Sequence, residues 1–268
     1  MTKLVHSFWT KPSLIPRYGY KCEQLFLNLW YFSLSVAYAK RIGAPIVLHT
    51  DTLGERLFGH LPYDDVKLTL DDMQAPPRFW AAGKFYAMQA EQGRAIHIDG
   101  DVFIKRPGLW ERMKNSDSDL LVQYREGWLD TVVRDRLARH MSKDFFEHDC
   151  MYNTGVFGIF NEQLKKEILS TYFDTIIKAK NLPSSLLDDQ NFTPDLVCEQ
   201  QMVAYKSKGY KVDFLLSDWY NCREEANKIG FQHVLSSSKF RDVAKCKEVL
   251  KRVDLNIYLK TKKLCWDM

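Results

Sequence analysis

Two carboxylates separated by one glycine follow an apolar segment near the middle of the chain. In "RAIHIDGDVFI", residues 94–104, Asp99 and Asp101 come directly after "AIHI". Residues two apart in an extended segment point the same way, so these like charges converge and repel each other. A divalent cation between them would relieve the repulsion, and Mg²⁺ or Mn²⁺ suits oxygen ligands that also recruit substrate phosphates. The pattern predicts a metal site, with an ordinary Asp-Gly turn as the alternative.

Alternating strands and helices precede this pair and must position it. Short apolar runs predict strands, and longer runs with stop signals predict helices between them. The strands are expected at 3–9, 44–50, 66–70 and 95–99, and the helices at 21–41, 53–61 and from about Arg78 to Gly93. This alternation favours a parallel sheet, in which ligands collect beyond the carboxyl ends of the strands. The two carboxylates stand at such an end.

The second half of the chain is less regular. We expect strands at 119–125, 151–160, 211–217 and 231–235, and helices at 161–180 and 195–208. Residues 126–149 are charged and mixed, and they are a candidate lid. No repeat or low-complexity linker divides the chain, so one domain is favoured: residues 1–240, with a basic helix or tail, 241–268, packed on it.

Composition sets the broad class of the protein. With 268 residues, 46% of them hydrophobic, the chain can bury a sizeable core and should be compact. The six cysteines form no CxxC pair and no leader precedes them, which predicts reduced thiols and a cytoplasmic protein. The apolar stretch at 25–39 is too short for a membrane span and contains Asn28, Ser33 and Ser35, so we interpret it as a buried helix.

Charge is concentrated near the C-terminus. Residues 239–263 carry nine lysines and arginines against three acids, a local charge of +6, whereas the whole chain carries +4. This segment could make peripheral contact with the inner face of a membrane or with a lipid phosphate, although the charge by itself favours a solvated helix face. Nucleic acid is not expected as a partner, because aromatic residues do not interleave with the basic ones.

A phosphatase of the haloacid-dehalogenase type would use nearly the same letters, with Asp99 as nucleophile and Asp101 as acid/base. In that family the signature continues as Asp-Gly-Thr or Asp-Gly-Val and lies on the first strand of the fold. Here the glycine lies between the carboxylates and about three strands come earlier. The phosphatase therefore stays the second candidate.

Several segments together resemble glycosyltransferases of the GT-A fold that carry a DxD motif. Their order along the chain matches that family, which counts for more than any single motif. The segments are "KLVHSFW" (3–9), "FWAAGKFYAMQAEQGRAIHIDGDVFI" (79–104), "MYNTGVFGIFN" (151–161), "CEQQMVAY" (198–205) and "FQHVLSSSKF" (231–240). The resemblance implies an α/β, GT-A-like single domain with a mixed, mainly parallel central sheet flanked by helices and a Rossmann-like nucleotide-binding half.

The resemblance also implies roles around the metal. Asp101 and His233 would be metal ligands, and Asp99 a ligand or a ribose contact. Gly100 and Lys84 would lie against the donor, and Lys239 near the diphosphate. For His233 and Lys84 the alternatives are an ordinary surface or core histidine and a solvated helix charge.

Further roles follow for residues on the sugar and base sides. Asn153 would hydrogen-bond a sugar hydroxyl, and Glu199 and Gln200 would contact the acceptor or steady the anomeric centre. His6 and Trp9 would line the nucleotide pocket. The alternatives are strand-end packing for Asn153, helix capping for Glu199 and Gln200, and core packing for Trp9.

The activity implied is a metal-dependent transfer of a hexose-type sugar from a nucleotide donor, expected to be a UDP-sugar, to a glycan or lipid-linked acceptor. Mn²⁺ or Mg²⁺ would be the cofactor, and a late histidine ligand favours retention of anomeric configuration. A third alternative is a catalytically inactive protein that binds nucleotide sugars without turnover.

Overall fold

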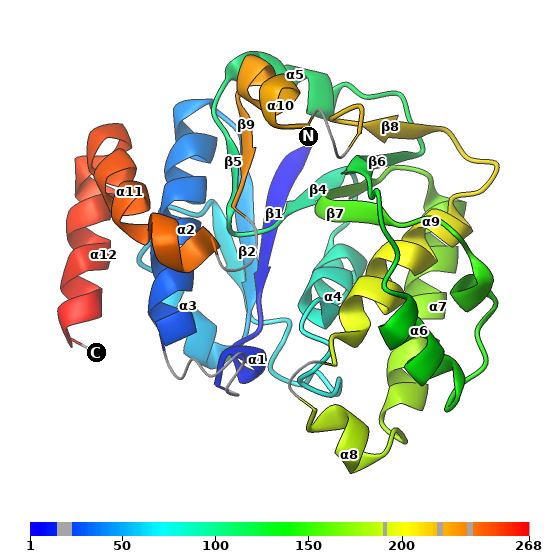
Figure 1. Cartoon of the computed structure of the whole chain (residues 1–268). Helices are drawn as coiled ribbons and strands as arrows, with labels where there is room; N and C mark the ends of the chain where they lie inside the picture. Colours follow the sequence, from blue (N-terminus) through cyan, green and yellow to red (C-terminus); the bar gives the residue numbers. More distant parts are fainter. Residues whose placement is uncertain (15–22, 190–191, 219–221, 235–237, 268) are drawn as a thin grey trace.

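The protein is built around one mixed β-sheet, seen in a computed structural model that describes residues 1–14, 23–189, 192–218, 222–234 and 238–267. The sheet has seven strands in the order β3-β2-β1-β4-β7-β6-β8. Strand β7 is antiparallel to both neighbours, and every other pairing is parallel. Helices cover both faces (Figure 1). This confirms the predicted α/β fold with a mixed, mainly parallel sheet flanked by helices.

The strands are short and mostly buried. They are β1 (Lys3–Phe8), β2 (Ile46–Thr50), β3 (Asp65–Lys67), β4 (Ala95–Ile98), β6 (Leu120–Arg125), β7 (Tyr152–Ile159) and β8 (Val212–Phe214). A separate two-stranded antiparallel sheet is formed by β5 (Val102–Ile104) and β9 (Phe231–His233). Every residue of β2 and β4 is buried, as expected of central strands in a sheet covered by helices on both faces.

Helices form the C-terminal end of the chain and most connections between strands. They are α1 (Lys11–Leu14), α2 (Glu23–Arg41), α3 (Thr52–Phe58), α4 (Ala82–Ala90), α5 (Pro107–Lys114), α6 (Thr131–Ala138), α7 (Glu162–Ala179), α8 (Ser184–Leu187), α9 (Met202–Lys206), α10 (Cys222–Ile229), α11 (Ser238–Val253) and α12 (Leu255–Asp267). A 3₁₀ turn, Asp144–Glu147, and a π-helix, Leu196–Gln201, complete them. None of the described helices has the length and apolar character needed to cross a bilayer.

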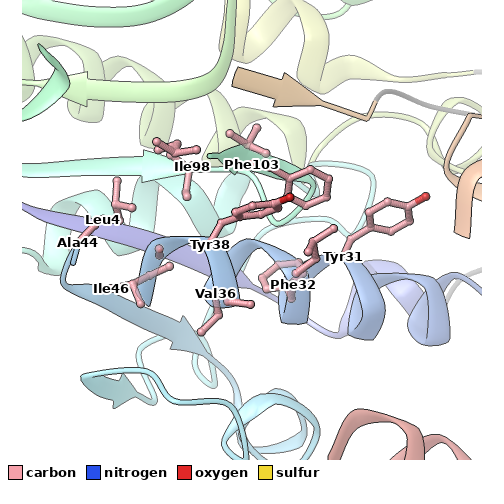
Figure 2. Packing of buried hydrophobic residues seen from close by; sticks show 14 of the residues in the cluster. Leu4, Tyr31, Phe32, Val36, Tyr38, Ala44, Ile46, Ile98 and Phe103 are labelled. Atoms are coloured by element: carbon pink, nitrogen blue, oxygen red, sulfur yellow. The ribbon is translucent and has the colours of Figure 1, made fainter. Parts of the chain in front are cut away.

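Helix α2 organises the core on one face of the sheet. Its side chains Tyr31, Phe32 and Tyr38 pack toward strand residues that include Ile98 and Phe103 (Figure 2). Its buried serines are satisfied: the Ser33 hydroxyl donates to the Leu29 carbonyl, and the Ser35 hydroxyl donates to the Val102 carbonyl. A helix that is apolar on most sides is therefore covered by sheet and helices, as predicted for residues 25–39.

Some boundaries differ from the sequence expectation. Strand β3 is Asp65–Lys67 rather than 66–70, and α4 begins at Ala82 rather than near Arg78. The Arg78 side chain instead donates to the Leu187 and Asp188 carbonyls, so this residue ties a loop to α8. Strand β5 and helices α1, α5, α8 and α10 were not anticipated, and the predicted C-terminal helix or tail, 241–268, corresponds to two helices, α11 and α12. The candidate lid contains α6 and the 3₁₀ turn, with Phe145 and Phe146 buried.

Cysteines in the described part of the chain are unpaired, namely Cys150, Cys198, Cys222, Cys246 and Cys265. Burial raises the pKa of each of these thiols. They are therefore poor nucleophiles at neutral pH. Cys22 lies outside the described residues.

Candidate functional site

The two carboxylates flank a tight turn between β4 and β5. The backbone amide of Val102 donates to the Asp99 carbonyl at 2.9 Å, and the Asp99 amide donates to the Gly155 carbonyl on β7 at 2.9 Å. A Cβ atom on Gly100 would lie only 1.9 Å from Cε2 of Phe32 on α2. A residue without a side chain is therefore needed between the carboxylates, because the turn packs directly on α2.

His233 joins the carboxylates because β9 pairs with β5. In this pairing His233 lies opposite Val102, the residue after Asp101. Asp99, Asp101 and His233 each offer one ligand atom, and these three atoms lie within 4.8 Å of one another. The two-stranded sheet thus brings together residues more than 130 positions apart in the chain.

The orientation of the His233 ring suits metal binding. Its Nδ1 atom lies 2.8 Å from the Oε1 atom of Gln123, an acceptor, so Nδ1 carries the proton in the neutral ring. Nε2 then carries the lone pair and faces the Asp101 Oδ1 atom at 3.5 Å. Metal-ligating histidines usually have such a partner on the other ring nitrogen. Two carboxylates and one such imidazole fit Mn²⁺ or Mg²⁺.

Lys239, at the start of α11, provides a positive charge beside the Asp101 carboxylate. Its Nζ atom lies 2.6 Å from the Oδ2 atom of Asp101, which is buried. Burial alone would raise the pKa of the Asp101 carboxyl, but the nearby positive charge of Lys239 outweighs it and holds that pKa well below its usual value. Asp101 is therefore ionised at neutral pH.

A second lysine, Lys84 on α4, links Asp99 to the π-helix. Its buried Nζ atom lies 3.2 Å from the Oδ1 atom of Asp99, donates to the Thr154 carbonyl at 2.8 Å and pairs with Glu199. Thr154 also donates a hydrogen bond to Glu199. Burial raises the pKa of Glu199 against the opposing effect of Lys84, whereas Asp99 and Glu199 raise the pKa of Lys84 despite its burial. Glu199 is thus held inside the protein by its partners.

The neighbouring π-helix residue, Gln200, has an unused polar atom. The Oε1 atom of Gln200 is buried, and within the described residues it has no hydrogen-bond partner. Unpaired buried acceptors are costly, so such an atom suggests a missing donor. Of the two π-helix residues predicted for the site, Gln200 has a buried acceptor atom without a partner in the described part of the chain, whereas Oε1 of Glu199 is already used by Lys84 and Thr154.

Asn153 hydrogen-bonds the carboxylate of Glu126, a residue that the sequence did not predict for the site. Its side chain donates to the Tyr124 hydroxyl at 3.2 Å and to Glu126 Oε1 at 2.8 Å, and it accepts from the Gly155 amide. The Oε2 atom of Glu126 is buried and has no hydrogen-bond partner among the described atoms. The sequence could have identified Glu126, because this carboxylate directly follows the predicted strand 119–125, just as Asp99 directly follows β4.

His6 and Trp9 lie outside the cluster of ligand atoms. The two ring nitrogens of His6 contact the Tyr63 and Ser35 hydroxyls, at 2.8 and 3.1 Å, and burial lowers the pKa of its imidazole to about 3. Trp9 is buried in the core on the α4 side of the sheet, and its Nε1 atom lacks a hydrogen-bond partner among the described residues. Their predicted place in a nucleotide pocket stays a prediction.

Comparison with known proteins places the chain in a family. Residues 2–259 match the sequence model of DUF6734, described as a family of unknown function. The chain belongs to DUF6734. A comparison with curated protein sequences finds no match.

Solved structures with similarity to this DUF6734 chain include two sugar transferases. Mouse xyloside xylosyltransferase 1 has 14% sequence identity and a TM-score of 0.40, and the match covers 81% of this chain and 86% of the mouse chain. The galactosyltransferase LgtC has 12% identity and a TM-score of 0.37, covering 81% and 73%. HddC from Yersinia pseudotuberculosis has 13% identity and a TM-score of 0.42, covering 93% and 100%. Similarities at this level do not establish a shared function.

Proposed function

We propose that this DUF6734 chain is a metal-dependent glycosyltransferase. It would move a hexose-type sugar from a nucleotide donor, a UDP-sugar, to a glycan or lipid-linked acceptor. One observation carries the proposal: Asp99, Asp101 and His233 converge at the edge of the sheet, and a lysine pairs with each carboxylate. Anionic and cationic groups arranged in this way suit a metal-bound diphosphate.

The chemistry of a nucleotide-sugar donor explains why such a cluster is useful. When the sugar leaves, negative charge grows on the oxygen that links it to the diphosphate. A divalent ion held by Asp99, Asp101 and His233 would act there as a Lewis acid. Lys239, close to Asp101, would add a positive charge for the same phosphate oxygens.

The remaining residues would bind and orient the sugars. The free acceptor atoms of Gln200 and Glu126 suit the hydroxyl groups of a sugar, which are hydrogen-bond donors. Asn153 would act indirectly, because its hydrogen bond to Glu126 Oε1 positions the carboxylate that would face the substrate. Glu199, with Lys84, would be a positioning residue that fixes the π-helix beside Asp99. We infer retention of anomeric configuration, which NMR of the first-formed product would test.

Calorimetry with UDP, in the presence and absence of Mn²⁺, tests the proposal. The protein should bind UDP only with Mn²⁺, and Asp101→Asn or His233→Ala should weaken that binding at least about tenfold. His140→Ala, which changes an exposed histidine, is the matched control and should bind as the wild type does. Thermal unfolding of each variant separates lost binding from lost folding. The proposal would be contradicted if the protein bound UDP with the same affinity without Mn²⁺ and in the Asp101→Asn variant.

The other candidate functions give different results in the same experiments. A phosphatase should not bind UDP, and its reaction should form a phospho-aspartyl group at Asp99. A binding protein should bind UDP with Mn²⁺ but release no sugar from the donor. Hydrolysis or transfer of a UDP-sugar, lost in Asp101→Asn, is the result expected of the enzyme.

A further inference from the structure

A cavity of about 550 Å³ lies between α2 and the two C-terminal helices, apart from the candidate metal site. Helices α11 and α12 lie on the outer side of α2 (Figure 1). The lining residues come from all three helices: Phe26, Trp30, Lys247, Tyr258, Lys262, Cys265 and Trp266. None of them has a role in the proposed transfer reaction. The volume is within the usual range for small-molecule sites.

Aromatic rings form much of the cavity wall. The rings of Trp30 and Tyr258 lie 5.7 Å apart between centroids, and the Nζ atom of Lys247 lies 4.9 Å from the Trp30 ring centroid. Trp266 is 80% exposed. A wall of this kind offers a large apolar surface with cations beside it.

The two lysines of the cavity lack anionic partners within the described part of the chain. The ion pairs found there involve neither Lys247 nor Lys262, and the described lining residues include no carboxylate. Two cations on an aromatic wall favour a ligand with an anionic group.

The lining also argues against a sugar or a nucleobase as the ligand. Those molecules carry several hydrogen-bond donors that need acceptors, and the described lining offers one good acceptor, the Tyr258 hydroxyl. Apolar surface continues outside the cavity instead. On α12 the exposed Leu255 and Leu259 share a face with Lys262 and Trp266, because these residues recur at helical spacing.

We propose that this cavity binds an anionic phospholipid at a bilayer surface. Lys247 and Lys262 pair with the phosphate of the headgroup, while Trp266, Leu259 and Leu255 contact the apolar region beneath it. Charge complementarity and the adjoining apolar stripe carry this assignment. It does not depend on the proposed transferase activity.

Sedimentation with lipid vesicles tests the proposal. The full-length protein should sediment with vesicles of phosphatidylcholine that contain phosphatidylglycerol, and not with phosphatidylcholine alone. The double variant Lys247→Gln/Lys262→Gln removes the cavity cations. Lys251→Gln/Lys260→Gln is the matched control, because it removes one exposed lysine from each of the same two helices, outside the cavity.

The cavity variant should lose at least about tenfold more vesicle binding than the control variant. Trp266→Ala should weaken binding as well, whereas Trp128→Ala, which changes another exposed tryptophan, should not. Equal losses in the two double variants would indicate general attraction by the basic segment and would overturn the cavity assignment. Failure of the wild type to sediment with the anionic vesicles would overturn it too.

Discussion

At the residue scale, the position of His233 depends on the absence of a side chain at Gly155. A Cβ atom there would lie 2.5 Å from His233 Cε1 and 2.6 Å from Gln123 Oε1. Both distances are shorter than real Cβ contacts. A side chain at position 155 would therefore push the side chains of His233 and Gln123 out of their present positions. Their mutual hydrogen bond sets the ring orientation, and the ligand geometry depends on it.

We therefore expect Gly155→Ala to weaken Mn²⁺ binding at least about tenfold. The packing conflict should also lower the free energy of unfolding by about 1 to 3 kcal/mol. Calorimetric titration with Mn²⁺ and urea unfolding measure the two effects. An alanine variant that binds Mn²⁺ like the wild type would show that His233 does not depend on this contact.

A second prediction at this scale concerns Glu91, a buried carboxylate at the end of α4. It accepts from Lys3 at 2.6 Å, from Lys67 at 2.5 Å and contacts His49 Nε2 at 2.7 Å. Burial would raise the pKa of Glu91, but hydrogen bonds from Lys3 and Lys67 lower it to about 2. One carboxylate therefore joins β1, β2 and β3 to α4.

Glu91→Gln should lower the free energy of unfolding at pH 7 by about 2 to 4 kcal/mol, because three donors lose an ionised acceptor. The folded-state pKa of Glu91 is depressed, so its contribution is complete above the usual value near 4.5 and is lost as the pH falls toward 2. Urea unfolding at several pH values should show the difference between wild type and variant shrinking over that interval. A difference that stays constant down to pH 2 would contradict the assigned cause.

At the scale of elements, helix α2 and the β4–β5 turn fit together through Gly100. The ring of Phe32 occupies the space that a side chain at position 100 would need. Phe32 itself contacts His6, Phe8 and Phe58, so it cannot move without disturbing the core. Helix packing thus constrains the turn that carries Asp99 and Asp101.

Gly100→Ala should therefore destabilise the protein by about 1 to 3 kcal/mol or more and should impair Mn²⁺ binding in the fraction that folds. Gly108→Ala is the control, because a Cβ atom at that position in α5 would meet nothing within 4 Å. Its effect should be neutral or slightly stabilising. Chemical unfolding of both variants gives the comparison, and equal stability of the two would contradict the packing argument.

At the scale of the whole molecule, the C-terminal helices form part of the same core as α2. Leu250 of α11 and Ile257 of α12 are buried in the cluster that contains most of α2. The Thr261 hydroxyl, fully buried, lies 2.8 Å from the Ser33 hydroxyl of α2. The boundary predicted at residue 240 falls within α11, which begins at Ser238. That boundary stays a prediction.

Removing one core side chain of α11 should therefore destabilise the entire protein. We expect Leu250→Ala to cost about 2 to 5 kcal/mol, while Leu255→Ala, at an exposed position of α12, should stay within about 0.5 kcal/mol of the wild type. Tryptophan fluorescence and far-UV circular dichroism should report one coincident unfolding transition for each protein. A separate early transition in Leu250→Ala would indicate that the C-terminal helices unfold on their own.

Much of the fold could be predicted because the signals are local. The alternation of apolar strands with helices indicated a mainly parallel sheet, and the order of the motifs indicated the approximate positions of the strands. Strand β5 and helix α5 were missed because they are short, with three and eight residues. Tertiary packing, rather than local periodicity, stabilises elements of this length.

Sequence by itself determined that Asp99 and Asp101 follow a buried strand, since an apolar run and its end are properties of neighbouring residues. The structure joins the two carboxylates by a tight turn rather than by the expected extended segment. Only the tertiary structure decided which partners reach them. Gln123 orients His233, Lys84 joins Asp99 to Glu199, and Lys239 pairs with Asp101. Most of these residues are about a hundred or more positions apart, and chain folding alone brings them within hydrogen-bonding distance. Nothing in the local sequence of either partner specifies such a contact.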